Sequence, residues 1–145
     1  MARSGAELLV AGLEAAGVDV VFGLPGVHNL AAWEAVRESP IRLVGVRHEQ
    51  AAVYAADGYA RATGRVGVAL VTTGPGAANT LGACGEAWAS RSPVLVVATD
   101  IPTALRQRGV HRGVLHECVR VDGPPAPGVD EQGAVAHRGE HPRVE

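Results

Sequence analysis

The sequence has few aromatic residues, few cysteines and almost no net charge. Aromatic residues make up 3% of the 145 residues, against nineteen glycines, which predicts tight turns and helices packed closely on small residues. The formal net charge of −2 lacks the basic excess that is typical of nucleic-acid binding. No apolar run is long enough for a membrane span or a signal peptide. We therefore expect a soluble, cytoplasmic protein with no nucleic-acid or membrane partner.

The cysteines and histidines do not form a recognisable metal motif. Cys84 and Cys118 lie far apart in no metal or redox spacing, so reduced thiols are expected. His137 and His141 have the i, i+4 spacing of helical zinc ligands, but Gly139 between them and a following proline argue against a helix there. We predict no metal site from these residues.

Helical and strand patterns alternate as far as about residue 104. Runs at 18–24, 41–46, 66–72 and 94–99 predict strands, and their apolar residues are continuous rather than alternating, as when both faces of a strand are covered. A capping box at Ser4 and Glu7 starts a first helix, and two further helices are expected at 30–36 and 49–63. The pattern predicts an α/β domain with a doubly wound parallel sheet and helices on both faces.

A fourth helix is expected after the third strand. Ala77, Leu81, Cys84 and Trp88 recur along one face of this segment at helical spacing. We expect Trp88, and Trp33 in the second helix, to lie in the core.

Glu49 occupies a strand-to-helix junction. The run 41–46 precedes it, and the alanine-rich helix pattern that begins at Glu49 ends at Gly64. A carboxylate in a first helical turn is favoured by the helix dipole, so Glu49 is either an ordinary helix-starting residue or a functional group. His48 either orients this carboxylate or packs against the fold. The sequence spacing alone leaves both alternatives open.

Two other junctions carry glycine–proline turns, at Pro25-Gly26 and at Gly74-Pro75-Gly76. Because the carboxyl ends of parallel strands meet at one rim of a sheet, both turns should lie near Glu49. The second turn has two glycines of a dinucleotide-binding fingerprint but Asn79 at the third position. A glycine turn that serves only geometry and a cofactor site are both compatible with this pattern.

Four motifs together resemble the thiamine diphosphate-dependent enzymes, most of all the acetolactate synthase-like group. They are Val-Phe-Gly-Leu-Pro-Gly at 21–26, Arg-His-Glu-Gln-Ala-Ala at 47–52, Ala-Asp-Gly-Tyr-Ala-Arg-Ala-Thr-Gly at 56–64 and Thr-Gly-Pro-Gly-Ala-Ala-Asn at 73–79. The resemblance is to the N-terminal, pyrimidine-binding domain of that family. It implies that residues 1–117 form this domain, truncated at its C-terminal end because a later helix and strand are missing.

The resemblance implies thiamine diphosphate as cofactor and Glu49 as the catalytic residue. In the family, this glutamate hydrogen-bonds a ring nitrogen of the aminopyrimidine and so favours the tautomer that removes a proton from the thiazolium ring. The resemblance implies cofactor binding by further residues: Pro25 and Gly26 would line the catalytic pocket, and the pyrimidine would be packed by Thr72, Pro75, Gly76 and Asn79. At 99–100 this chain has Thr-Asp where acetolactate synthases proper tend to have Gly-Gln, which favours a looser relative.

The family holds the diphosphate through Mg²⁺ on a Gly-Asp-Gly motif of another domain, and this sequence contains no Gly-Asp-Gly. We therefore expect half a cofactor site and no turnover by the chain alone. The polar segment 118–145 is expected to be disordered or frame-shifted.

Three functions are compatible with the sequence. The first is the pyrimidine-binding part of a carboligase or 2-oxo acid decarboxylase, and the second is one subunit of a split two-chain decarboxylase. The third is a non-enzymatic binding or dimerisation module. The expected partners are a small 2-oxo acid and either a second copy, through the helix after Glu49, or a chain with the diphosphate-binding domain.

Overall fold

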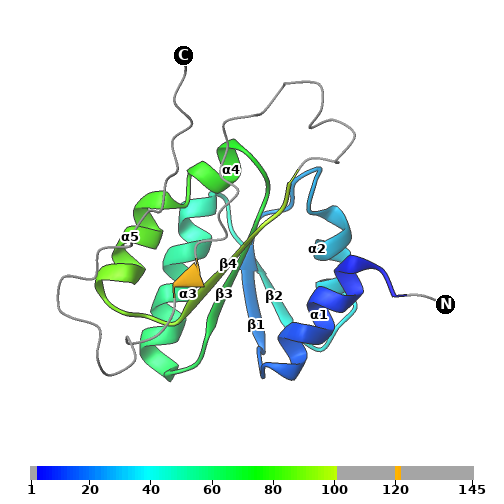
Figure 1. Cartoon of the computed structure of the whole chain (residues 1–145), viewed down its shortest axis with the longest axis horizontal. Helices are drawn as coiled ribbons and strands as arrows, with labels where there is room; N and C mark the ends of the chain where they lie inside the picture. Colours follow the sequence, from blue (N-terminus) through cyan, green and yellow to red (C-terminus); the bar gives the residue numbers. More distant parts are fainter. Residues whose placement is uncertain (1–2, 101–119, 122–145) are drawn as a thin grey trace, which may run out of the picture.

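The computed structural model describes residues 3–100 and 120–121 (Figure 1). The helices are α1 (Gly5–Ala15), α2 (Leu30–Arg37), α3 (Glu49–Thr63), α4 (Pro75–Ala78) and α5 (Leu81–Ala89). The strands are β1 (Val20–Gly23), β2 (Arg42–Gly45), β3 (Gly67–Val71), β4 (Val94–Ala98) and β5 (Arg120–Val121). All four strands expected from the sequence are present, each slightly shorter than its apolar run.

The strands form one sheet in the order β2-β1-β3-β4-β5. The first four strands are parallel, and the two-residue β5 pairs antiparallel with β4. The chain runs from β1 to β2 on one side and then crosses to β3 and β4 on the other, which confirms the doubly wound α/β fold. β5 comes from the segment 118–145; the rest of that segment lies outside the described residues, so its expected disorder stays a prediction.

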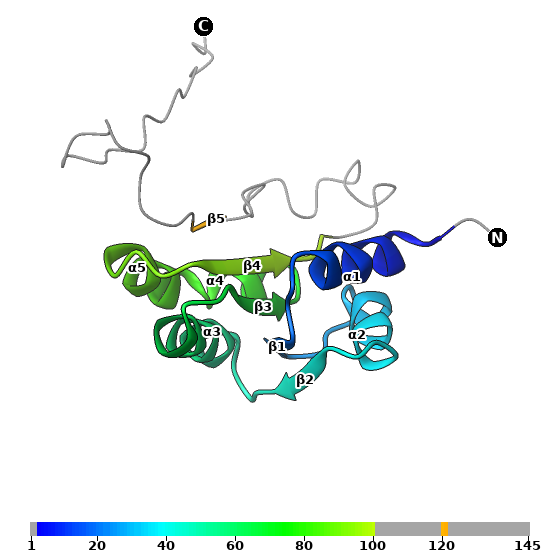
Figure 2. The same ribbon diagram turned by 90° about the horizontal axis from the view of Figure 1, so that it is seen from below.

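Helices cover both faces of the sheet. Figure 2 shows α1 and α2 on one face and α3 and α5 on the other. Each face has its own buried apolar cluster: Val10, Leu13, Val36 and Val68 belong to the first, and Val53, Ala56, Ala83 and Val96 belong to the second. All five residues of β3 are buried, as expected for a strand covered on both faces. β2 is partly exposed along its length because it is an edge strand, so the expectation of full coverage is wrong there.

Local signals set the helix ends. The Ser4 hydroxyl accepts from the Glu7 N–H at 3.2 Å, while the Glu7 carboxylate accepts from the Ser4 N–H at 2.6 Å, which confirms the capping box of α1. α3 spans the residues expected from the sequence and ends at Gly64, whose φ of +70° is the left-handed conformation that glycine favours. None of the helices in the described part has the length and apolar character that a bilayer crossing requires.

α3 lies unusually close to β3. A Cβ atom placed on Gly67 would lie 2.0 Å from the carbonyl oxygen of Ala56. Only glycine in the strand and alanine in the helix allow the two backbones to approach this closely. The contact ties the helix that begins with Glu49 to the central strand of the sheet.

The structure corrects two expectations about the fourth helix and the tryptophans. The expected helix is divided into α4 and α5 at residues 79–80. On α5 the buried stripe is Ala83, Cys84 and Ala87, so Trp88 falls on the outward face and is 50% exposed. Trp88 is therefore not a core residue, whereas Trp33 is partly buried and packs against the cluster beneath α1 and α2.

Candidate functional site

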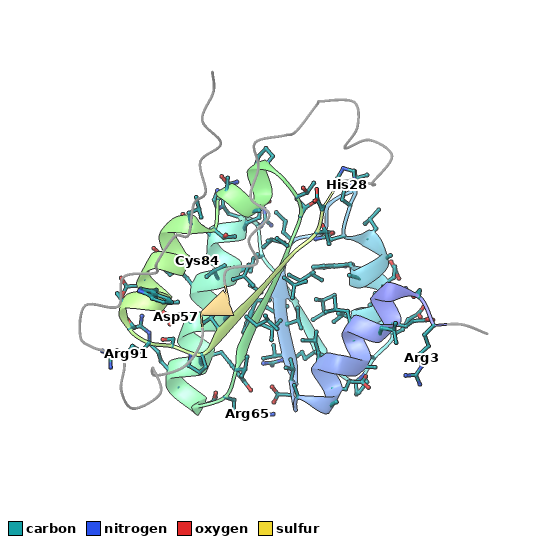
Figure 3. All side chains as sticks on the ribbon, viewed as in Figure 1. Arg3, His28, Asp57, Arg65, Cys84 and Arg91 are labelled. Carbon is teal, nitrogen blue, oxygen red and sulfur yellow. The ribbon has the colours of Figure 1, made fainter. Side chains whose placement is uncertain are left out.

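The three predicted junctions lie at one rim of the sheet. The loops that follow β1, β2 and β3 all leave from the carboxyl ends of parallel strands. Figure 1 shows α4 and the start of α3 at the upper rim, and Figure 3 shows His28 there as well, with Arg65 at the opposite end of the sheet. The fold therefore gathers the candidate residues from separate parts of the sequence.

Glu49 is the first residue of α3 and is 8% exposed. The strand pairing continues past β2, because the Val46 N–H donates to the Gly23 carbonyl at 2.8 Å. His48 then caps the helix: its Nδ1 accepts from the Gln50 N–H at 3.2 Å. His48 thus helps to start the helix that carries Glu49. This capping role differs from both sequence-based alternatives, in which His48 orients the carboxylate directly or only packs against the fold.

The Glu49 carboxylate is held by an amide and not by a cation. Its Oε2 accepts from Asn79 Nδ2 at 3.1 Å, and in residues 3–100 and 120–121 it forms no salt bridge. Asp57, the other buried carboxylate of α3, differs: Arg61 Nη2 lies 2.7 Å from its Oδ2. This guanidinium holds the pKa of Asp57 below its ordinary value. Asp57 is therefore paired with a cation within the fold, whereas the hydrogen-bond donor to Glu49 is a neutral amide.

Two glycines far apart in the sequence, Gly26 in the loop after β1 and Gly76 in α4, abut Thr72, which follows β3. A Cβ on Gly26 would lie 2.6 Å from Thr72 Cβ, and a Cβ on Gly76 would lie 2.6 Å from Thr72 Cγ2. The same atom on Gly76 would lie 3.1 Å from Glu49 Oε1. The backbone of Gly76 therefore packs against both the threonine and the carboxylate, which only glycine permits at this position.

The structure brings together five of the seven sequence-predicted site residues. Gly26, Thr72, Gly76 and Asn79 adjoin one another or Glu49 through the contacts above. Pro25 and Pro75 are exposed, and neither takes part in those contacts. Pro75 instead occupies the first turn of α4, after Gly74 with its φ of +62°.

Sequence reasoning missed Asn29, which is 1% exposed. Its Oδ1 accepts from the Gly26 N–H at 2.7 Å, and its Nδ2 donates to the Leu24 carbonyl at 3.0 Å. The signal was present as an asparagine three residues after a Pro-Gly turn, a spacing at which the amide can reach back to the turn backbone.

The described residues hold no group of three or more His, Cys, Asp or Glu that could bind a metal ion. The histidine candidates His137 and His141 lie outside the described residues. The arrangement at the rim is a buried carboxylate beside the close backbone of Gly76.

The comparison with known families agrees with this arrangement. Residues 3–122 match the model of the thiamine pyrophosphate enzyme, N-terminal TPP binding domain. The chain belongs to this family. The match contains all four motifs, and it confirms both the resemblance and the assignment to a domain that binds thiamine diphosphate.

Several curated relatives are similar over most of the family match. A probable acetolactate synthase large subunit of Methanocaldococcus jannaschii is 45% identical over 70% of this chain and 17% of the relative. A probable 2-ketoarginine decarboxylase of Pseudomonas aeruginosa is 48% identical over 70% of the chain and 18% of the relative. The 2-hydroxyacyl-CoA lyase 2 of Mus musculus is 45% identical over 77% of this chain and 18% of the relative. The chain thus spans less than a fifth of the length of these relatives.

Proposed function

We propose that this chain forms the pyrimidine-binding half of a thiamine diphosphate site, with Glu49 as its acid–base group. The observation that carries the proposal is the buried Glu49 carboxylate, which has an amide donor and no cation partner in the described part of the chain. A carboxylate placed in this way can accept a hydrogen bond from a protonated ring nitrogen and share its proton.

Each neighbour has a definite part in this proposal. The Asn79 amide orients the carboxylate through Oε2, and Oε1, which lies beside the Gly76 backbone, is the oxygen proposed to meet the ring nitrogen. The backbone of Gly26 and Gly76, packed on Thr72, forms the wall against which a pyrimidine ring would lie. Thiamine diphosphate, when bound, supplies the carbon chemistry of 2-oxo acid decarboxylation or carboligation.

We further propose that Mg²⁺ and the diphosphate are held by a separate domain or by a partner chain. The sequence has no Gly-Asp-Gly, and the chain spans less than a fifth of its curated relatives. The chain alone is therefore expected to release no CO₂ from pyruvate in the presence of thiamine diphosphate and Mg²⁺. Decarboxylation by the purified chain would contradict this part of the proposal. A cytoplasmic location stays a prediction, which cell fractionation would check.

Binding can be tested on the ¹⁵N-labelled chain by NMR titration. We expect thiamine and thiamine diphosphate with Mg²⁺ to bind with similar, weak affinity, because the diphosphate has no anchor here. Both ligands should shift the amide signals of Glu49, Gly76 and Gly26. Glu49→Gln should weaken binding about tenfold or more, since a hydrogen bond to a charged group contributes about 1.5–3 kcal/mol.

The matched control is Glu14→Gln, which removes an exposed carboxylate from α1 and should leave binding unchanged. Absence of any shift near Glu49 with both ligands, or equal affinity for Glu49→Gln and the unmodified chain, would overturn the proposed site.

The outward face of α3 and α5 is the proposed contact with a second copy of the chain. Tyr54 is 46% exposed and Trp88 is 50% exposed, and the small residues Gly58 and Gly85 lie on the same helices. Sedimentation velocity should show dimers that Tyr54→Arg dissociates. Leu8→Arg, at a residue on α1 that is 57% exposed, is the control and should leave the dimer intact.

A further inference from the structure

Asn29 has an unusual place for a buried amide. It precedes α2 as the N-cap residue, a position where asparagine ordinarily accepts a hydrogen bond from the second or third helical N–H. Here its side chain makes no such bond with α2. It turns back instead to the loop after β1, where it bonds to Gly26 N–H at 2.7 Å and to Leu24 carbonyl oxygen at 3.0 Å.

Backbone bonds complete the fastening of this loop. The Asn29 N–H donates to the Gly26 carbonyl at 3.0 Å, so both polar groups of Gly26 are bonded to Asn29. The Leu24 N–H donates to the Leu70 carbonyl of β3 at 3.3 Å, and the Trp33 N–H donates to the Asn29 carbonyl at 2.8 Å. The loop is therefore tied to the sheet at one end and to α2 at the other, with Asn29 as the common partner.

The position of Gly26 determines the shape of the rim. Its missing side chain is what allows contact with Thr72, whose methyl group in turn adjoins Gly76 next to Glu49. A small shift of the loop away from Thr72 would open a gap in this wall, and a shift toward it would cause a clash. The residue that holds Gly26 in place therefore sets the fit of whatever lies against the wall.

We propose that Asn29 is a positioning residue for the thiamine-binding wall, which it builds by holding Gly26 against Thr72. The ligand part of this inference rests on the proposed function, whereas the loop part rests on the contacts alone. Asn29 acts through Gly26, and in the part of the chain that the structure describes its side-chain hydrogen bonds go to Gly26 and Leu24 and not to Glu49. Its loss should disturb one side of the site and leave the Glu49–Asn79 pair unchanged.

The test uses the ¹⁵N-labelled, methyl-labelled full chain and the variants Asn29→Ala and Asn29→Ser. Serine is itself a good N-cap residue, so Asn29→Ser spares α2 and serves if the alanine variant does not fold. In either variant we expect the Gly26 amide to exchange with solvent about tenfold faster or more, because its bond to the side chain is gone. The Thr72 methyl signal should shift, and thiamine affinity should fall about tenfold.

Leu13→Ala is the matched control, because Leu13 is 6% exposed in the cluster beneath α1 and α2 and is remote from the rim. It should lower overall stability without changing the Thr72 methyl signal or the thiamine affinity of the folded chain. Unchanged Gly26 exchange and Thr72 signal in the Asn29 variants would overturn the positioning role.

The outcomes also separate the two proposals. If the unmodified chain binds no thiamine, the proposed function fails, and the Gly26 and Thr72 signals still decide whether Asn29 holds the loop. If thiamine binds equally well to the unmodified chain and to the Asn29 variants, the role of Asn29 in the wall is refuted while the function of Glu49 stands.

Discussion

Replacing Gly67 with alanine tests how closely α3 lies on the sheet. The added Cβ would lie 2.0 Å from the Ala56 carbonyl oxygen, 2.6 Å from its carbon and 3.0 Å from its Cα. All three atoms are backbone, so no side-chain rotation relieves the overlap. Because ordinary contacts involving carbon are about 3.5–4.0 Å, α3 must retreat from β3 by roughly 1 Å or more.

This retreat would loosen the apolar cluster beneath α3. Ala52, Val53 and Ala56 are all 0% exposed and would lose contacts with β3 together. Overpacking in a core typically costs about 1–3 kcal/mol, and we expect about 3 kcal/mol because rigid backbone opposes the new atom. A domain of this size is stable by only about 5–15 kcal/mol, so the loss is large.

Urea unfolding followed by circular dichroism measures this effect. Gly58→Ala is the control within the same helix, because Gly58 is exposed and a Cβ there meets nothing within 4 Å. That variant should be more stable by about 0.5–1 kcal/mol, since alanine favours helix over glycine. If Gly67→Ala unfolds within about 0.5 kcal/mol of the unmodified chain, the close approach of α3 to β3 is refuted.

Three further predictions concern titration, capping and thiol burial. The arginine partner lowers the pKa of Asp57, so the ion pair stabilises the fold above about pH 4, and this contribution is lost as the pH falls through the folded-state pKa. Asp57→Asn should therefore flatten the fall in unfolding free energy below that pH. An unchanged slope would contradict the assignment. His48→Ala should cost about 1 kcal/mol in urea unfolding through loss of the α3 cap, whereas His28→Ala, in an exposed loop, should cost nothing measurable. Burial raises the pKa of the Cys84 thiol and so slows its reaction with an aromatic disulfide reagent. In a Cys118→Ser variant at pH 8, this reagent should modify the native chain much more slowly than the urea-unfolded chain. Equal rates would exclude the buried position.

Much of the fold could be predicted because its signals are local. The bounds of α3 follow from a β-rich run before Glu49 and a glycine after Thr63, and α1 follows from its capping box. The convergence of Gly26, Gly76 and Glu49 could be predicted because parallel strands bring successive loops to one rim.

Other features depend on tertiary contacts that a linear pattern does not contain. The helical spacing from Ala77 to Trp88 gave no sign of the break between α4 and α5, which places Trp88 outward. The bonds of Asn29 to Leu24 and Gly26 depend on how the loop after β1 folds back on itself. The expectation that β2 is fully buried was wrong because β2 lies at an edge of the sheet, and the order of the strands cannot be read from the run of apolar residues.

Thr72 has a consequence for how this region can change. Two separate turns meet the same small side chain, so neither can gain bulk unless position 72 loses some. Gly76→Ala should be partly rescued by Thr72→Ala, which removes the Cγ2 atom, whereas Gly26→Ala should need Thr72→Gly, because alanine keeps the Cβ atom that Gly26 abuts. In both pairs the double variant should be less destabilised than the sum of its single effects. Segments that are far apart in the sequence are thus coupled through one shared volume, and this coupling limits which paired substitutions the domain can accept.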